Sequence, residues 1–377
     1  MAAPPLWRSA LIGLATWAAA ASTYVLVTLF SWMIDDKQGP ALARMYQYWN
    51  HWDTGHYIRI SRVGYTPDRP DTHAFFPLFP ILLRGFDAII PGPTLVASLV
   101  LSNLACIGAL TVLHRFALHE FDQVIADRML LFLMAWPTAF YLSAGYNESL
   151  FVLLSAAALY RMRKGDFWTA GALGALASAT RLSGALLTVA FLAEYVRQRG
   201  WRPRRPDAAA ILLIPLGLAG FSLFCWATLG DPLAFSHAQG QWGRQFTTPW
   251  TGLLQALDTL SVHPLLHQVA THNFIDVVST VVTLGLLVAC AVGPWLRRDL
   301  FPLVLYSAAS FLVVLTGPVG GSFPLQGAPR YALEFIPIFF LLARLGASRA
   351  FERLYLLPAM GLQAVFLLTF INNVWVA

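Results

Sequence analysis

The sequence predicts an all-α integral membrane protein, and its composition and its apolar segments both support that prediction. Of the 377 residues, 57% are hydrophobic and only 12% are charged, whereas soluble globular domains carry about 25% charged residues. Apolar stretches of roughly 20 residues recur from end to end, and a helix of that length crosses the ~30 Å hydrocarbon core of a bilayer. Nothing resembles a separate soluble domain, so residues 1–377 are expected to form a single polytopic membrane domain.

The apolar segments and the basic clusters between them predict the topology. About 10–11 transmembrane helices are expected from the candidate spans, which lie at about residues 10–33, 94–117, 128–146, 149–163, 167–197, 208–229, 274–296, 300–316, 331–346 and 354–376. The basic residues between the spans are Arg161, Arg163, Lys164, Arg197, Arg199, Arg202, Arg204, Arg205, Arg297, Arg298, Arg344, Arg349 and Arg353. Lys and Arg collect in cytoplasmic loops, which places the N-terminus inside and the C-terminus outside. These short clusters account for the net charge of +6 without a nucleic-acid partner, which would need one continuous basic face.

Residues 167–197 do not fit a simple count of spans. Basic clusters flank this segment at both ends, and its length is too great for one span and too small for two. Two short helices that meet near Thr180–Gly184 fit best, as a re-entrant hairpin or as two short spans. Irregular backbone at membrane depth is tolerated only where it is buried in protein or faces water, so the region around Arg181 is expected to line a cavity.

Two long loops, at about residues 34–93 and 230–273, are expected on the outer side of the membrane. Each mixes aromatic, Pro, Gly and polar residues, and each holds short amphipathic stretches such as Leu253–Leu266. Such stretches are typical of helices that lie in the membrane interface.

Asp53 is the strongest candidate for a catalytic residue. It lies in the first outer loop between Trp52 and Thr54, with His51 and His56 close by in the chain. A carboxylate beside low-dielectric surroundings is a better proton acceptor than one in bulk water. The alternative is structural, because Asp53 could instead cap a helix from Thr54 to Val63. Both roles are compatible, since a capping Asp can still present one oxygen to a substrate.

Further polar residues are expected on the same outer side. Asn147 and Glu148 lie in a hairpin between two spans, and Arg330 opens a span that contains Glu334. Ionisable residues within the membrane are functional candidates by default, and an Arg at a cavity wall suits bidentate capture of a phosphate. The structural alternative is a buried pair, either Glu148 with Arg181 or Glu334 with Arg330.

No metal or other cofactor is predicted. His51, Asp53 and His56 have i, i+2, i+5 spacing, which does not place all three on one helical face, and no second acidic residue adjoins Asp53 to complete a hard-cation site. The three cysteines all fall in apolar stretches and show no disulfide or metal spacing.

The sequence resembles the PIG-V-like mannosyltransferases of the GT-C glycosyltransferase superfamily. The segments that carry the resemblance follow the family order over most of the chain. They are His51-Trp52-Asp53 with His56-Tyr57, Phe75–Pro80, Trp136–Phe151, Ala179–Gly184, Gly230–Phe235 and Arg330-Tyr331. The Ala, Arg, Pro and Gly content is typical of a GC-rich bacterium, so a bacterial member is expected.

The resemblance implies a GT-C-type helical bundle with a catalytic first outer loop. It also implies an enzyme that moves a mannosyl unit, or another hexose, from a polyprenyl-phosphate carrier to an acceptor hydroxyl with inversion. By that analogy Asp53 is the general base, and Arg181, Arg330 or Arg244 stabilises the leaving phosphate. Further donor contacts are expected from His56 and Tyr57, and the substrate pocket is expected to include His51, Trp52, Phe76, Asn147, Glu148, Gln239, Trp242 and Glu334.

The resemblance has departures, and other functions stay open. Many GT-C enzymes carry two adjacent acidic residues in this loop, whereas Asp53 stands alone, and relatives often have another aromatic residue at the position of His56. The family's eukaryotic acceptor is a GPI-anchor intermediate, which a bacterium lacks, so the acceptor is expected to be a different lipid or glycan. The expected location is the cytoplasmic (inner) membrane, with the active site on the extracytoplasmic side. The alternatives are a GT-C transferase of another lipid-linked sugar, a lipid-linked-sugar transporter or flippase, and a non-catalytic partner subunit.

Overall fold

The computed structural model describes residues 5–34, 41–201, 205–264 and 267–376. Parts of both predicted outer loops and two residues of one basic cluster, Arg202 and Arg204, lie outside these ranges. The described residues are helical apart from turns, loops and an isolated β-bridge between Arg244 and Val319. They divide into two compact units. Unit 1 comprises residues up to 64, residues 77–161 and residues 339–376, and unit 2 comprises residues 65–76 and 162–338.

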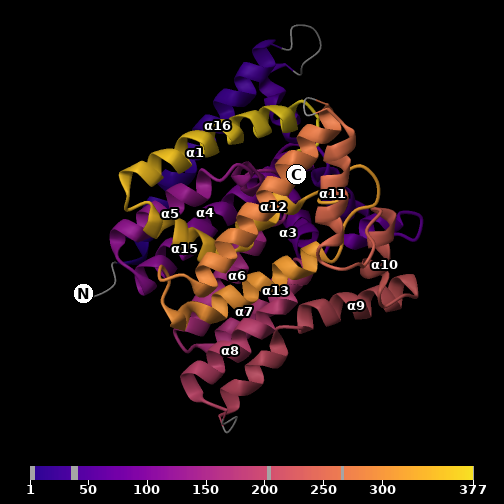
Figure 1. Ribbon diagram of the computed structural model, residues 1–377. Coiled ribbons are helices and arrows are strands. Elements are labelled where there is room, and N and C mark those ends of the chain that lie inside the picture. Colours follow the sequence, from indigo (N-terminus) through magenta and orange to yellow (C-terminus); the bar gives the residue numbers. More distant parts are fainter. Residues whose placement is uncertain (1–4, 35–40, 202–204, 265–266, 377) are drawn as a thin grey trace. The chain divides into compact units, whose positions relative to one another are not determined.

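Five of the described helices are long and apolar enough to cross a membrane. They are α1 (Leu6–Ile34), α4 (Thr94–Glu120), α12 (Gln268–Val292), α13 (Phe301–Leu315) with the short helix η6 (Arg298–Leu300), and α16 (Arg349–Ile371). A sixth span results if η5 (Pro206–Leu213) and α9 (Leu216–Leu229), which meet at a 42° bend, cross together. The chain is therefore a multi-pass, all-α membrane protein (Figure 1).

The helices of unit 1 pack through small and polar residues. Helix α1 lies along α4 and also contacts α16. At Gly13 the approach is so close that an added Cβ would lie 3.1 Å from the backbone nitrogen of Thr111. The indole of Trp17 donates a 2.7 Å hydrogen bond to the side chain of Asn103. Because lipid is as apolar as a protein core, such close contacts and interhelical hydrogen bonds hold membrane helices together.

Two predicted spans are not continuous helices. The segment expected at 128–146 is broken into α5 (Gln123–Met134) and η3 (Ala139–Leu142), and α6 (Glu148–Arg163) follows. Pro137 explains the break, because a proline lacks an N–H donor and disfavours helical geometry in the residue before it. The segment expected at 331–346 is likewise divided into α14 (Ala328–Tyr331), η7 (Ala332–Glu334) and α15 (Ile336–Leu345).

The first predicted loop, residues 34–93, contributes short helices to both units. In unit 1 these are η1 (Leu42–Trp49), α2 (Asp53–Val63) and α3 (Leu78–Asp87), and in unit 2 the short helix is η2 (Pro70–Ala74). Helix α3 buries Phe79 and Leu83 and exposes Ile81, and α2 and α3 each pack against α4. Unit 1 thereby fixes the start of α2 against a membrane-spanning helix.

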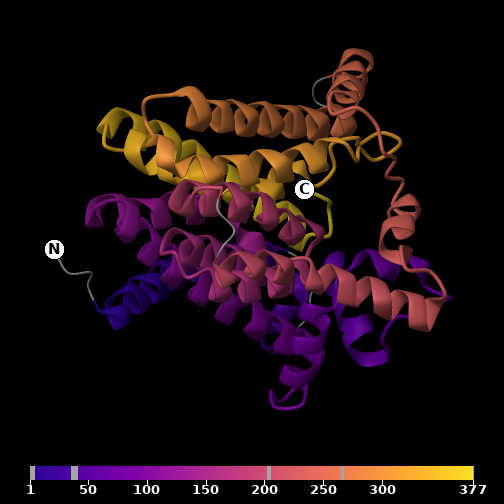
Figure 2. The same ribbon diagram turned by 90° about the horizontal axis from the view of Figure 1, so that it is seen from below.

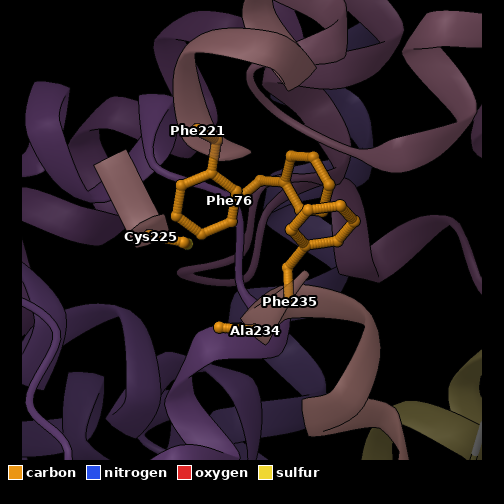
Figure 3. Packing of buried hydrophobic residues seen from close by; sticks show 5 residues of the cluster. All are labelled: Phe76, Phe221, Cys225, Ala234 and Phe235. Carbon is orange, nitrogen blue, oxygen red and sulfur yellow. The ribbon is translucent and has the colours of Figure 1, made fainter. Parts of the chain in front are cut away.

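Unit 2 combines membrane helices with the second predicted loop, residues 230–273. Its other helices are α7 (Phe167–Ser178), η4 (Leu182–Leu186), α8 (Leu187–Arg199), α10 (Ala234–Gln241) and α11 (Thr251–Val262). Helices α12 and α13 pack side by side, as both views show (Figure 2). Helix α9 leads to α10, and both contribute to a buried cluster of Phe76, Phe221, Cys225, Ala234 and Phe235, in which the three aromatic rings face one another (Figure 3).

Gly184 allows the segment around Arg181 to fold tightly onto α7. A Cβ at this position would overlap the backbone of Ala177 and Ser178. We therefore expect Gly184→Ala to lower the free energy of unfolding by about 1–3 kcal/mol, the usual range for overpacking. Gly220→Ala is the matched control, because an added Cβ there meets nothing within 4 Å. Thermal unfolding in detergent should separate the two variants, and equal midpoints would contradict the close approach.

Candidate active site

A strained backbone turn precedes Asp53, which lies at the start of α2. Trp52 has φ +52° and ψ −118°, and it is one of two non-glycine residues with positive φ among the described residues, the other being Asn373. The N–H of Thr54 donates to the carbonyl of His51 at 3.3 Å and closes the turn. A non-glycine residue in such a conformation costs about 1–3 kcal/mol and persists only where its surroundings enforce it, commonly at functional sites.

Asp53 is the first residue of α2, and the residue in the N-cap position is Trp52. The interpretation of Asp53 as the N-cap of a helix that starts at Thr54 is therefore wrong by one residue, and Trp52 makes no side-chain capping hydrogen bond. In the first turn a carboxylate is favoured by the positive end of the helix dipole. Asp53 as a whole remains partly exposed.

Several contacts within unit 1 hold this turn. The hydroxyl of Tyr146 donates to the carbonyl of His51 at 3.2 Å. The ring of Trp52 makes an edge contact with Trp375 at 4.9 Å between centroids. Gly145 packs so closely that an added Cβ would lie 3.1 Å from the methyl group of Thr54. The turn is thus fixed on three sides, which is what a strained backbone requires.

His51 is held as a neutral imidazole beside this turn. Burial lowers its pKa, and a hydrogen bond to the carbonyl of Ile371 acts in the opposite direction without overcoming the effect of burial. The Nε2 atom lies 3.3 Å from that carbonyl oxygen, which can only accept, so Nε2 carries the proton. The Nδ1 atom is then an acceptor.

The hairpin that contains Asn147 and Glu148 lies next to the Asp53 turn. Gly145 in this hairpin contacts Thr54, and Ser102 on α4 donates to the carbonyl of Tyr146 at 2.9 Å. Asn147 and Glu148 are 5% and 2% exposed. Unit 1 therefore places the hairpin that carries these two buried polar residues against the start of α2.

The other unit 1 candidates take different positions on α2. His56 is partly exposed, whereas Tyr57 is buried with its ring 4.8 Å from that of Phe79. The ring of Tyr57 thus packs α2 onto α3.

Unit 2 brings three arginines together around Tyr331. The guanidinium of Arg181 lies over the Tyr331 ring, 4.9 Å from its centroid. The side chains of Arg244 and Arg330 converge on Gly327, where an added Cβ would lie 3.8 Å from one nitrogen of each. Gly327 has φ +86°, a conformation that favours glycine. The charges of Arg244, Arg181 and Arg330 all act on Tyr331.

Glu334 supplies negative charge within this arginine cluster. Its carboxylate lies 3.2 Å from a guanidinium nitrogen of Arg181 and accepts a 3.2 Å hydrogen bond from the hydroxyl of Ser183. Glu334 is 1% exposed. The structure thus pairs Glu334 with Arg181, which lies far from it in the sequence. The cluster thus brings three guanidiniums together with the carboxylate of Glu334, and guanidinium groups suit the binding of an anion.

Arg244 also has a structural role. It donates to the carbonyl of Gly317 at 2.8 Å and to that of Gln326 at 3.3 Å. These bonds fix the loop that leads to Arg330. A guanidinium has five N–H donors, so Arg244 can bind the loop and still contribute to anion binding.

The remaining predicted pocket residues belong to the outer-loop part of unit 2. Phe76 is 6% exposed and packs in the aromatic cluster (Figure 3), so its ring serves packing and is not open to a substrate. Trp242 is 38% exposed, and its indole donates to the carbonyl of Asp71 at 3.0 Å. Gln239 is partly exposed, and its carbonyl accepts the N–H of Arg244 at 3.0 Å.

Two tyrosines near the candidate site were not predicted as site residues. Tyr146 fixes the turn before Asp53, and Tyr331 lies among the three arginines. Tyr146 precedes Asn147 and Tyr331 follows Arg330 in the sequence. This adjacency to predicted site residues could have identified both tyrosines. No group of three His, Cys, Asp or Glu side chains that could hold a metal occurs within the described ranges.

The fold defines a multi-pass membrane protein with a partly exposed carboxylate on a strained turn in unit 1 and an arginine cluster in unit 2. Comparison with known proteins identifies its family. A model of the family described as mannosyltransferase (PIG-V) matches residues 6–204, which is more than half of the chain. The chain belongs to this mannosyltransferase family. The match includes Asp53, Glu148 and Arg181 and ends before Arg244.

Curated relatives agree with this assignment. GPI alpha-1,6-mannosyltransferase 2 of Rattus norvegicus is 34% identical over 154 residues, which is 38% of this chain and 30% of the relative. The Homo sapiens protein of the same name gives the same identity and coverage, and that of Mus musculus is 33% identical over the same length. The match thus spans about a third of the length of these relatives. No solved structure matches the chain.

Proposed function

We propose that the chain is an inverting glycosyltransferase that moves a mannosyl unit from a polyprenyl-phosphate carrier to an acceptor hydroxyl at the outer membrane face, with Asp53 as the general base. The observation that carries the proposal is the placement of Asp53. It lies within the family match, it follows a backbone turn that is strained at Trp52, and it is a partly exposed residue at the start of a helix.

The proposed reaction needs one proton acceptor and one site for an anion. Asp53 takes the proton of the acceptor hydroxyl as the oxygen attacks the anomeric carbon. A new glycosidic C–O bond forms, the bond from the anomeric carbon to the phosphate oxygen breaks, and polyprenyl phosphate leaves with the bonding electron pair. Attack opposite to the departing phosphate inverts the anomeric configuration.

The arginine cluster supports the second requirement. The leaving phosphate gains negative charge in the transition state, and preorganised positive groups are most effective where charge develops. Arg181, Arg330 and Arg244 converge around Tyr331 and Gly327, and Arg is suited to bidentate binding of phosphate. We assign these three side chains to the donor phosphate.

The names of the relatives suggest the linkage. They are called GPI alpha-1,6-mannosyltransferase 2, and transfer of that specificity to this chain gives a sugar acceptor with a free 6-hydroxyl group. The acceptor is then a lipid-linked or glycan sugar that reaches the outer face of the membrane.

Broken membrane helices favour a second candidate, a transporter of lipid-linked sugars. Transporters bind substrates at interrupted helices, and breaks occur here between α5 and α6 and between α7 and α8. A transporter would move the lipid-linked sugar across the bilayer without breaking a covalent bond, whereas the proposed enzyme forms a new glycosidic bond and releases polyprenyl phosphate.

Transfer by the purified protein in liposomes tests the proposal. We expect radiolabel from polyprenyl-phosphate-mannose to appear in an added glycolipid acceptor, together with an equal amount of polyprenyl phosphate, and no label to be transferred from GDP-mannose. Transfer from GDP-mannose alone would reject the lipid-linked donor. Movement of intact donor between leaflets without transfer would support the transporter.

A further inference from the structure

Helix α13 carries two buried hydroxyl groups that the proposed reaction does not use. They belong to Tyr306 and Ser310, which lie about one turn apart and are 0% and 2% exposed. The two hydroxyls are neighbours and interact with each other, but neither has a hydrogen-bond partner of standard geometry among the described residues. A buried hydroxyl without a partner is costly, so the pair requires a partner from another source.

The two hydroxyls cannot satisfy each other completely. Each holds one proton to donate and can also accept a hydrogen bond. A bond between the two uses one proton, and the other proton still needs an acceptor. Ser307 on the same helix differs, because its hydroxyl donates to the carbonyl of Leu303 at 3.0 Å. At least one donor of Tyr306 or Ser310 is therefore available to a bound molecule.

The hydroxyl pair lies beside the arginine cluster of unit 2. Helix α13 packs against both η4 and α14, the short helices on which the cluster is built. The ring of Phe311 on α13 makes an edge contact with that of Phe335, at 5.7 Å between centroids, and Phe335 directly follows Glu334. The charges of Glu334 and Arg181 both act on Tyr306. The pair is therefore close to the carboxylate of the cluster.

Glu334 gives this side of the cluster a chemistry that differs from that of the arginines. A carboxylate repels a phosphate, whereas it accepts hydrogen bonds from neutral hydroxyls, as it does here from Ser183 at 3.2 Å. Guanidinium groups suit the oxygens of a phosphate, which only accept. A carboxylate beside hydroxyls suits the hydroxyl groups of a sugar, which both donate and accept.

We propose that Tyr306, Ser310 and Glu334 bind hydroxyl groups of the mannosyl unit in the lipid-linked donor. This inference rests on the proposed function, in which the arginine cluster binds the phosphate of the same donor. The sugar is bonded directly to that phosphate, so its hydroxyls lie next to the phosphate site. Glu334 accepts from one sugar hydroxyl, and the hydroxyls of Tyr306 and Ser310 exchange hydrogen bonds with others. These side chains then contribute to the choice of sugar.

Equilibrium binding to the purified protein in detergent, without an acceptor, tests this proposal. Labelled polyprenyl-phosphate-mannose and unlabelled polyprenyl phosphate, which lacks the sugar, give two separate dissociation constants. We expect Tyr306→Phe and Ser310→Ala each to weaken binding of polyprenyl-phosphate-mannose by about 3- to 10-fold, the usual effect of one lost hydrogen bond. Binding of polyprenyl phosphate should not change. Variants that bind both ligands as wild type does, or that weaken both equally, would overturn the proposal.

The thermal unfolding midpoint of the unliganded protein is a second readout. Tyr306→Phe removes a buried hydroxyl that lacks a regular partner, so the midpoint should stay the same or rise. A lower midpoint would show that the protein itself satisfies this hydroxyl, and would contradict the proposal. Ser307→Ala is the matched control, because its hydroxyl bonds within its own helix. It should leave the binding of both ligands unchanged.

Binding by the wild-type protein separates this inference from the proposed function. We expect wild type to bind polyprenyl-phosphate-mannose more tightly than polyprenyl phosphate. Equal binding of the two ligands would overturn the sugar contacts and leave the phosphate site in place. Wild type that binds neither ligand would reject the lipid-linked donor, and with it both the proposed function and this inference.

Discussion

Asp53→Asn is expected to reduce the rate of mannosyl transfer by about 10²- to 10⁴-fold, the usual contribution of a general base. The substitution keeps the shape of the side chain and removes its capacity to accept a proton. Because the proton is transferred in the transition state, the loss should fall on kcat, with a smaller change in KM. Single-turnover transfer from labelled polyprenyl-phosphate-mannose isolates this step from product release.

Asp87→Asn is the matched control for Asp53. Asp87 is a partly exposed Asp of the same outer loop and ends helix α3. Its substitution should leave the transfer rate close to that of wild type. If both variants lose activity equally, the effect is one of loop charge or folding and not of a base at Asp53.

Glu334→Leu is expected to lower the free energy of unfolding by about 3–5 kcal/mol, the usual cost of removing one partner of a buried ion pair. The variant leaves Arg181 without its carboxylate partner and close to Tyr331, where Arg244 and Arg330 also act. The Arg181→Met/Glu334→Leu double variant should recover much of the loss, because replacing a buried pair with apolar residues is often neutral.

The free energies of unfolding of the two single variants and of the double variant together give the coupling energy between Arg181 and Glu334. A double variant that is destabilised by the sum of the single effects would show that Arg181 and Glu334 act independently, against the 3.2 Å pair in the structure. Transfer should stay low in the double variant even where stability recovers, since Arg181 is also assigned to the donor phosphate.

The apolar segments predict the long helices well, because length and hydropathy alone determine whether a helix can cross a bilayer. The spans expected at 10–33 and 94–117 fall within α1 and α4, and the span expected at 354–376 overlaps α16, which ends at Ile371. The interruption after Met134 was missed. Residues 129–146 are mostly apolar, which favours one continuous span, whereas Pro137 disfavours helical geometry in the residue before it.

The sequence was sufficient to propose residues for the candidate site, but it did not predict their local geometry. Asp53 was identified from the residues around it and from the family resemblance. Its position as the first residue of α2 depends on the positive φ of Trp52. The sequence does not predict that conformation, because tryptophan has no preference for positive φ. The pairing of Arg181 with Glu334 joins residues far apart in the chain, and sequence proximity had favoured Arg330. Such pairings are set by tertiary packing, which no local pattern encodes.

The measurement that tests the central claim most directly is chemical rescue of Asp53→Ala in the liposome transfer assay. Asp53 is partly exposed, so a small carboxylate such as formate can occupy the space left by the side chain and accept the proton. The account predicts that Asp53→Ala is inactive, that formate restores part of the transfer, and that formate has no effect on wild type or on Asp87→Ala. Wild-type transfer by Asp53→Ala without formate would contradict the assignment of Asp53 as the general base.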